Sequence, residues 1–151
     1  MKYTVEIELD LPREKVIEIF DNPDNMQHWQ TGFLSFEPIS GTPGERGAKS
    51  RLRYMMGKKE MELIETITLR DLPERFDGTY ECPGVWNEVK NRFEVVGSRK
   101  TRWVSENEFR FSSFFMKLMA FVMPGVFRRQ SRKFMQNFKE FAEQNRSVLP
   151  S

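Results

Sequence analysis

Hydrophobic and polar residues alternate along most of the first 111 positions, and this period of two residues is typical of β-strands with one buried face. In the first run, Val5, Ile7 and Leu9 alternate with acidic neighbours. Turn-forming Gly, Pro, Asn and Asp residues separate successive runs. The pattern predicts strands at residues 3–9, 33–39, 49–56, 61–69, 75–82, 87–96 and 101–111.

Two short helices are expected between the first and second strands. Pro12 suits the first position of a helix, and an apolar stripe follows it up to Phe20. The turn-forming residues 21–25 end this helix, and a second helix or turn is expected around His28 and Trp29.

From Phe114 onward the hydrophobic period becomes that of an α-helix. On a helical projection centred on Phe127, the apolar residues fall within about 40° of it and the basic residues lie on the opposite arc. Pro124-Gly125 predicts a kink or break in this helix. The apolar stripe comprises Met116, Ala120, Met123, Phe127, Phe134, Phe138 and Phe141. The basic arc comprises Arg128, Arg129, Arg132, Lys133 and Lys139.

This order of elements predicts an α+β fold in which an antiparallel sheet of about six to seven strands packs against one long helix. The 151 residues suit a single domain, spanning 1–151, because a domain of this size buries about 70% of its unfolded surface. No internal repeat and no linker-like stretch marks a second domain.

Composition adds a surplus of soft, bulky side chains, with 14 Phe and 9 Met. Such residues fill irregular apolar space, so they indicate either a large core or the wall of a cavity. The net charge of +2 is distributed unevenly, since residues 114–146 contain seven bases and two acids. The C-terminal helix is therefore expected to be a basic element on a mildly acidic body.

Several classes of site are disfavoured by the residues that the chain lacks. It has one cysteine, Cys82, and one histidine, His28, so neither an intramolecular disulfide nor a zinc site of the usual ligands is expected. No cofactor or metal is predicted. Nucleic acid is not expected as a partner, because acids are numerous and the isoelectric point is only about 8.7. The acidic start of the chain and the lack of a long apolar run favour a cytoplasmic location.

Four pieces of the chain together resemble the superfamily of START domains, the birch-pollen Bet v 1 allergen and polyketide cyclases. They are the strand followed by the proline turn at residues 11–16, the segment 21–29 that ends in Trp29, the glycine loop 41–47, and the aromatic end of the last helix. The resemblance covers about residues 3–145 and implies the helix-grip fold, a curved sheet wrapped around the C-terminal helix. It also implies a cavity between sheet and helix that takes lipids, sterols, quinones or polyketides.

Strand and helix parity predicts which side chains would line such a cavity and bind a ligand. The candidates are Tyr54, Met56, Leu63, Glu65, Ile67, Tyr80, Phe93, Trp103, Met116, Met123, Phe127 and Phe134. The glycine loop would lie near one end of the cavity in this superfamily, where it could act as a gate.

Glu65 and Asn91 are the polar residues of greatest chemical interest. Glu65 shares a strand face with Leu63, Ile67 and Leu69. A carboxyl on such a wall would have a raised pKa suited to acid–base work or ligand binding. A β-bulge would instead turn it to water. Asn91 lies on an apolar face with the same ambiguity.

The leading functional hypothesis is a non-enzymatic carrier or binding module for an apolar ligand, with the helix as a lid whose leading part, residues 114–123, moves to admit the ligand. The alternative is a polyketide cyclase- or dehydratase-like enzyme that uses Glu65 or Asn91. A weaker alternative is a protein-interaction module that uses the outer sheet face around Lys49, Arg51 and Arg53. An anionic membrane surface is a further candidate partner, through the basic arc.

Overall fold

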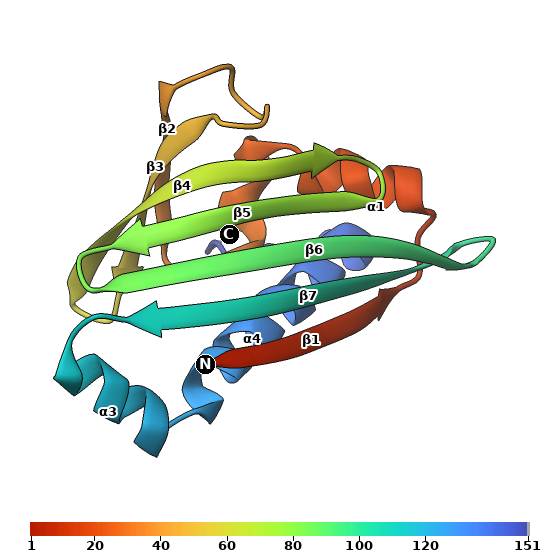
Figure 1. Ribbon diagram of the computed structural model, residues 1–151. Coiled ribbons are helices and arrows are strands. Elements are labelled where there is room, and N and C mark those ends of the chain that lie inside the picture. Colours follow the sequence, from red (N-terminus) through yellow and green to blue (C-terminus); the bar gives the residue numbers. More distant parts are fainter. Residues whose placement is uncertain (151) are drawn as a thin grey trace.

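The protein folds as one curved antiparallel sheet of seven strands in the order β1-β7-β6-β5-β4-β3-β2, seen in a computed structural model that describes residues 1–150 (Figure 1). Every pair of neighbouring strands is antiparallel. The α+β helix-grip architecture expected from the sequence is confirmed. The strands are β1 (Lys2–Leu9), β2 (Phe33–Ser40), β3 (Lys49–Met56), β4 (Lys59–Asp71), β5 (Arg75–Cys82), β6 (Val85–Gly97) and β7 (Lys100–Phe111).

Helices connect and cover this sheet. The two short helices expected after β1 are present, with a short 3-10 turn between them, and the expected break in the C-terminal helix occurs at Pro124. Figure 1 shows the sheet curving around the last helix, while the helix before it stands beyond the end of β7. The elements are α1 (Arg13–Phe20), η1 (Pro23–Asn25), α2 (Met26–Trp29), α3 (Phe114–Val122) and α4 (Gly125–Gln144).

The core lies where α4 and α2 meet the sheet. Phe138 of α4 is fully buried, and its ring centroid lies 5.2 Å from that of Trp29 and 5.3 Å from that of Trp103. Phe93 stacks on Trp103 at 5.9 Å, and Phe20 meets both rings edge-on. This aromatic cluster fixes α4 across the sheet, since aromatic pairs in such geometries add to the stabilisation from burial alone.

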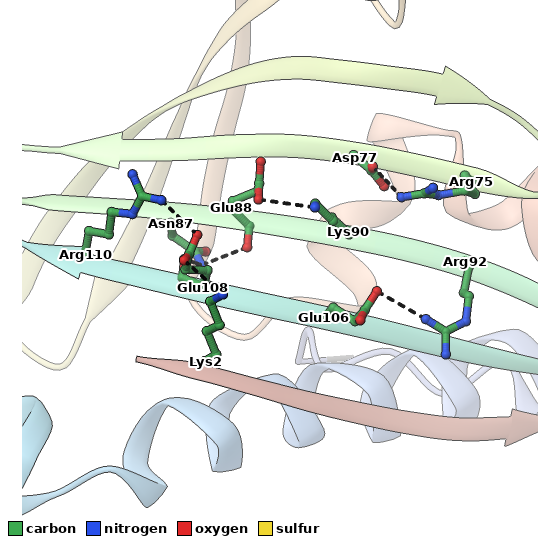
Figure 2. Close-up of polar contacts among 10 residues, drawn as sticks. All are labelled: Lys2, Arg75, Asp77, Asn87, Glu88, Lys90, Arg92, Glu106, Glu108 and Arg110. Atoms are coloured by element: carbon green, nitrogen blue, oxygen red, sulfur yellow. Dashed lines mark hydrogen bonds and ion pairs between the residues drawn. The ribbon is translucent and has the colours of Figure 1, made fainter.

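The outer face of the sheet is polar. Figure 2 shows ion pairs within and between neighbouring strands, among them Arg92 with Glu106 at 3.2 Å and Arg75 with Asp77 at 2.9 Å. Arg92 and Glu106 are both exposed, and exposed pairs contribute about 0–1 kcal/mol each. Asp77, by contrast, is buried although it lies on this face. The hydrophobic face of each strand therefore points inward, as the alternation predicted.

One bulge in β4 changes the predicted facing of its last residues. The register of β4 against β5 shifts between Ile67 and Leu69. Leu69 consequently pairs with Asp77 on the outer face, and Arg70 turns inward opposite Phe76. The expectation that Leu69 shares the inner face with Leu63 and Ile67 is wrong for this reason, because one extra residue reverses the side-chain alternation.

Candidate ligand cavity

A cavity of about 490 Å³ lies between the sheet and α4. Its volume falls within the range of small-molecule sites, about 300–1,000 Å³. Nine of the predicted wall residues line it: Tyr54, Met56, Leu63, Glu65, Ile67, Tyr80, Trp103, Phe127 and Phe134. Their part in ligand binding stays a prediction.

Three predicted wall residues lie elsewhere. Phe93 is 2% exposed and packed within the aromatic core, where Phe20 and Trp103 cover it. Met116 belongs to α3, and Met123 is exposed at the break before α4. The prediction failed for these two methionines because the helical projection treated residues 114–141 as one axis. Pro124 separates that stretch into two helices with independent directions.

Glu65 is the main polar group of the wall. It sits in the middle of β4 and pairs with Tyr80 of β5 and Ser50 of β3, upstream of the bulge. Its side chain is buried and lines the cavity, so the alternative in which a bulge turns it to water does not occur. Burial raises the pKa of Glu65, and a hydrogen bond with Tyr80 offsets only part of that rise.

Two phenols accompany this carboxyl. Burial raises the pKa of Tyr80, and the charge of Glu65 raises it further. The pKa of Tyr54 is raised in the same way, first by burial and then by Glu65. Tyr54 donates a hydrogen bond to the Gln30 side-chain oxygen at 2.6 Å, which fixes its ring. The wall therefore presents a carboxyl and two neutral phenols. Tyr54 has given its hydrogen to Gln30 and can only accept from a ligand, whereas a protonated Glu65 and Tyr80 share one hydrogen bond and keep one further hydrogen to donate.

A second set of polar groups lies on β6 and β7. The indole nitrogen of Trp103 donates to the side-chain oxygen of Asn91 at 2.9 Å, and both residues line the cavity. Asn107 donates to the Ser105 hydroxyl at 3.1 Å. Ser105, Asn107 and Asn87 were missed from the sequence, although their parity with Trp103 and Asn91 placed them on the inner face.

One end of the cavity is held by an ion pair that no periodicity signalled. Arg70 makes two hydrogen bonds to the Asp21 carboxylate, at 2.8 and 2.6 Å, and donates to the Gly44 carbonyl at 3.1 Å. Asp21 follows α1, and Gly44 belongs to the glycine loop, which with Pro43 lines this end. Arg70 thus links the glycine loop to the end of α1. Strand alternation alone would place Arg70 on the outer face, and the bulge turns it inward.

The other end involves the start of α4. The Tyr3 hydroxyl donates to the Phe127 carbonyl at 3.1 Å and lies 2.7 Å from the Ser131 hydroxyl. Phe127 packs on Phe109, with ring centroids 4.7 Å apart. These contacts hold the first turns of α4 over β1 and β7, so the cavity has a fixed wall here.

The two reactive side chains considered from the sequence lie off the cavity lining. His28 stacks on Phe141 at 4.9 Å, and its Nδ1 is 2.9 Å from the Ser147 hydroxyl. Cys82 is half-buried at the end of β5, and burial raises the pKa of its thiol. In residues 1–150, no three His, Cys, Asp or Glu side chains cluster closely enough to hold a metal ion. No helix in the same range is long and apolar enough to cross a membrane.

The residues of the basic arc differ in whether they contact other side chains and the backbone. Lys139 donates to the Glu8 carbonyl at 2.7 Å and pairs with Glu143 at 2.8 Å, so it fastens α4 to β1. The other members, Arg128, Arg129, Arg132 and Lys133, are exposed.

The family model described as polyketide cyclase / dehydrase and lipid transport matches residues 1–143. No sequence among curated proteins matches the chain. Among solved structures, a conserved protein from Geobacillus kaustophilus superposes with a TM-score of 0.80 at 15% identity, covering 96% of this chain and 97% of that one. The Zhui aromatase/cyclase from Streptomyces sp. R1128 gives a TM-score of 0.80 at 12% identity, with 96% and 94% covered. Norcoclaurine synthase from Thalictrum flavum, in complex with dopamine and hydroxybenzaldehyde, gives 0.71 at 15% identity, with 97% and 88% covered.

Proposed function

Because the chain belongs to the polyketide cyclase / dehydrase and lipid transport family, we propose that it binds and carries a neutral, largely apolar small molecule that bears a carbonyl or hydroxyl oxygen. The observation that supports this most is the apolar cavity of about 490 Å³ with Glu65, Tyr80 and Tyr54 on its wall. A ligand that buries about 300 Å² of apolar surface gains about 7.5 kcal/mol before the entropic cost of binding is subtracted.

The polar groups favour an uncharged ligand. A protonated Glu65 bonded to Tyr80 can donate one hydrogen bond and Tyr54 can accept one, but these groups supply no positive charge to a carboxylate. Within residues 1–150, Arg70 is the one cation on the lining, and it is already paired with Asp21. Quinones, sterols and uncyclised or aromatic polyketides therefore fit the wall better than free fatty acids do.

Native mass spectrometry of the purified protein, followed by organic extraction, tests this proposal. The cavity-lining Trp29 and Trp103 also provide a titration signal, and Trp86→Phe removes the third tryptophan, which lies off the lining. We expect saturable quenching with decylubiquinone or emodin, and weaker quenching with oleate. A protein that is isolated empty and shows no saturable response to any of these probes would contradict the carrier function.

A second candidate is a cyclase- or dehydratase-like enzyme, favoured by the buried carboxyl of Glu65 beside Tyr80. An acid with a raised pKa can exchange a proton with a substrate enol or carbonyl, and Asn91 could orient that substrate. The fold is shared with an aromatase/cyclase, which makes this chemistry a reasonable alternative. Glu65→Gln distinguishes the two: an enzyme would lose turnover of a polyketide substrate with binding nearly intact, whereas a carrier has no turnover to lose.

The third candidate, a protein-interaction module on the outer sheet face, is weaker. Arg51 pairs there with Glu37 and Glu62, and Arg53 pairs with Glu60. These bases are already neutralised within the sheet, so they offer a protein partner little net charge. A partner recovered in a pull-down that Arg51→Ala/Arg53→Ala abolishes would favour this reading.

A further inference from the structure

The helix α3 exposes an unusual amount of apolar surface. Its sequence, residues 114–122, contains one charged residue, Lys117. Phe114 is 80% exposed, Phe115 66% and Phe121 84%. Half of the sixteen exposed large hydrophobic residues described in the structure lie between residues 114 and 126: Phe114, Phe115, Leu118, Met119, Phe121, Val122, Met123 and Val126. Such a concentration is rare on soluble proteins and indicates a contact site.

This apolar surface is presented by a defined helix. The Ser113 side chain caps the N-terminus by accepting a hydrogen bond from the Met116 backbone at 3.1 Å. The Met123 N–H donates to the Met119 carbonyl at 2.8 Å, and Pro124 then ends the helix. Figure 1 shows α3 projecting past the end of β7, clear of the sheet. The exposed side chains thus stand at one extremity of the molecule.

Exposed bases lie on α3 itself and on the first turns of α4, which follows it directly. Residues 112–138 contain five bases and no acid. All five are exposed, and none of them forms an ion pair within residues 1–150. They are Lys117, Arg128, Arg129, Arg132 and Lys133. In contrast, Lys139, further along α4, is paired with Glu143.

We propose that α3 and the first turns of α4 form a docking surface for an anionic lipid bilayer. Apolar side chains on a short helix with flanking cations are the pattern of interfacial membrane binding, in which the apolar groups enter the acyl boundary and the bases contact phosphate groups. A helix of nine residues is about 13 Å long, so α3 lies in the interface and does not span it. A second copy of the chain fits the surface less well, because pairing two such surfaces brings ten unpaired cations together.

The docking surface adjoins the ligand cavity. Phe127, near the start of α4, lines the cavity and follows Val126 of the docking surface directly. Docking would bring that end of the cavity to the lipid. The proposal goes beyond ligand binding and holds even for an empty cavity, because it rests on the exposed surface alone.

Vesicle flotation with the full chain tests the proposal. We expect strong binding to vesicles of phosphatidylcholine and phosphatidylserine, weak binding to phosphatidylcholine alone, and loss of binding as salt is raised. Phe115→Ser/Phe121→Ser should lower partitioning at least about tenfold, because each ring leaves the acyl boundary. Arg128→Gln/Arg129→Gln should lower it about 25-fold, at about fivefold for each cation.

Matched controls lie at the opposite end of the sheet. Val95→Ser removes a side chain that is 59% exposed, and Arg99→Gln removes an exposed base from the β6–β7 turn. Both should bind vesicles as the wild type does, and all variants should keep the wild-type melting temperature. Equal binding to both vesicle types, or unchanged binding by either double variant, would overturn the proposal. So would a wild-type dimer that Phe115→Ser/Phe121→Ser dissociates, with no vesicle binding, since a second copy would then occupy the surface.

Discussion

At the scale of single residues, the face of Glu65 decides the chemistry of the cavity, and the sequence left that face open. Alternation placed Glu65 among Leu63 and Ile67, but a bulge anywhere upstream would have reversed it. The structure contains a bulge in β4, yet it follows Ile67. Glu65 precedes the bulge and therefore stays on the inner face. Arg70 follows the bulge, which turns its side chain inward. Bulges depend on pairing with the neighbouring strand, which local alternation does not encode.

Glu65→Gln should stabilise the protein in a pH-dependent manner. The pKa of Glu65 is raised above its ordinary value of 4.5, so the folded state holds a proton that the unfolded state has lost. Wild-type stability therefore falls as pH rises from about 4.5 through the higher folded pKa, and glutamine removes this loss. The melting temperature of the variant should exceed that of the wild type at pH 8, with a difference that shrinks towards pH 4. A difference that is constant with pH would show that the carboxyl is not shielded.

Gly32 is the described glycine at which an added Cβ would approach another atom most closely. Its φ is 85°, and an added Cβ would collide with the Met55 carbonyl oxygen, while the Met55 N–H donates to Gly32 O at 2.7 Å. Gly32→Ala should therefore cost at least about 2 kcal/mol of unfolding free energy. Gly57 is the matched control, because its φ is 65° but nothing lies within 4 Å of an added Cβ. Gly57→Ala should cost only about 1 kcal/mol in urea denaturation, and equal losses would refute the steric argument.

At the scale of elements, helical periodicity described α4 well and α3 poorly. Phe134 and Phe138 face the sheet as projected, since they lie on one uninterrupted axis. The helix before Pro124, α3, has a different axis, and many of its apolar side chains are exposed to solvent. The apolar composition of α3 indicated that its side chains would be covered. The local sequence does not tell whether the protein's own core or an external surface covers them.

Phe138→Ala measures what anchors α4. Phe138 is 0% exposed among Trp29, Trp103 and Phe20, so its loss leaves a cavity and should cost about 3–5 kcal/mol. The same substitution at Phe121, which is 84% exposed, should change the unfolding free energy by less than about 0.5 kcal/mol. Similar losses at both positions would mean that α3 packs on the protein in solution.

At the scale of the whole molecule, the order of elements was sufficient to predict the fold, whereas the cavity was implied only by family resemblance. Strand alternation places Phe93 and Phe109 on the same inner face of the sheet. Even so, Phe93 is enclosed in the core and Phe109 lines the cavity. That division depends on how far α4 stands from each part of the sheet. The aromatic cluster at one end of α4 and Phe127 at the other set this spacing between helix and sheet. The division between core and cavity is therefore visible only in the assembled structure.

A cavity that exists for a ligand can be filled without loss of the fold, which gives the test at this scale. Leu63→Trp projects into the cavity, where the space of about 490 Å³ accommodates the larger ring. We expect unfolding free energy to stay within about 1.5 kcal/mol of wild type while ligand-induced stabilisation disappears. Ile64→Trp places the same ring on the other face of the same strand and should leave ligand binding intact. With a ligand at about 100 times its Kd, wild type and Ile64→Trp should gain about 2.7 kcal/mol and Leu63→Trp nothing. If Leu63→Trp gained as much as wild type, the ligand would have to lie outside this cavity.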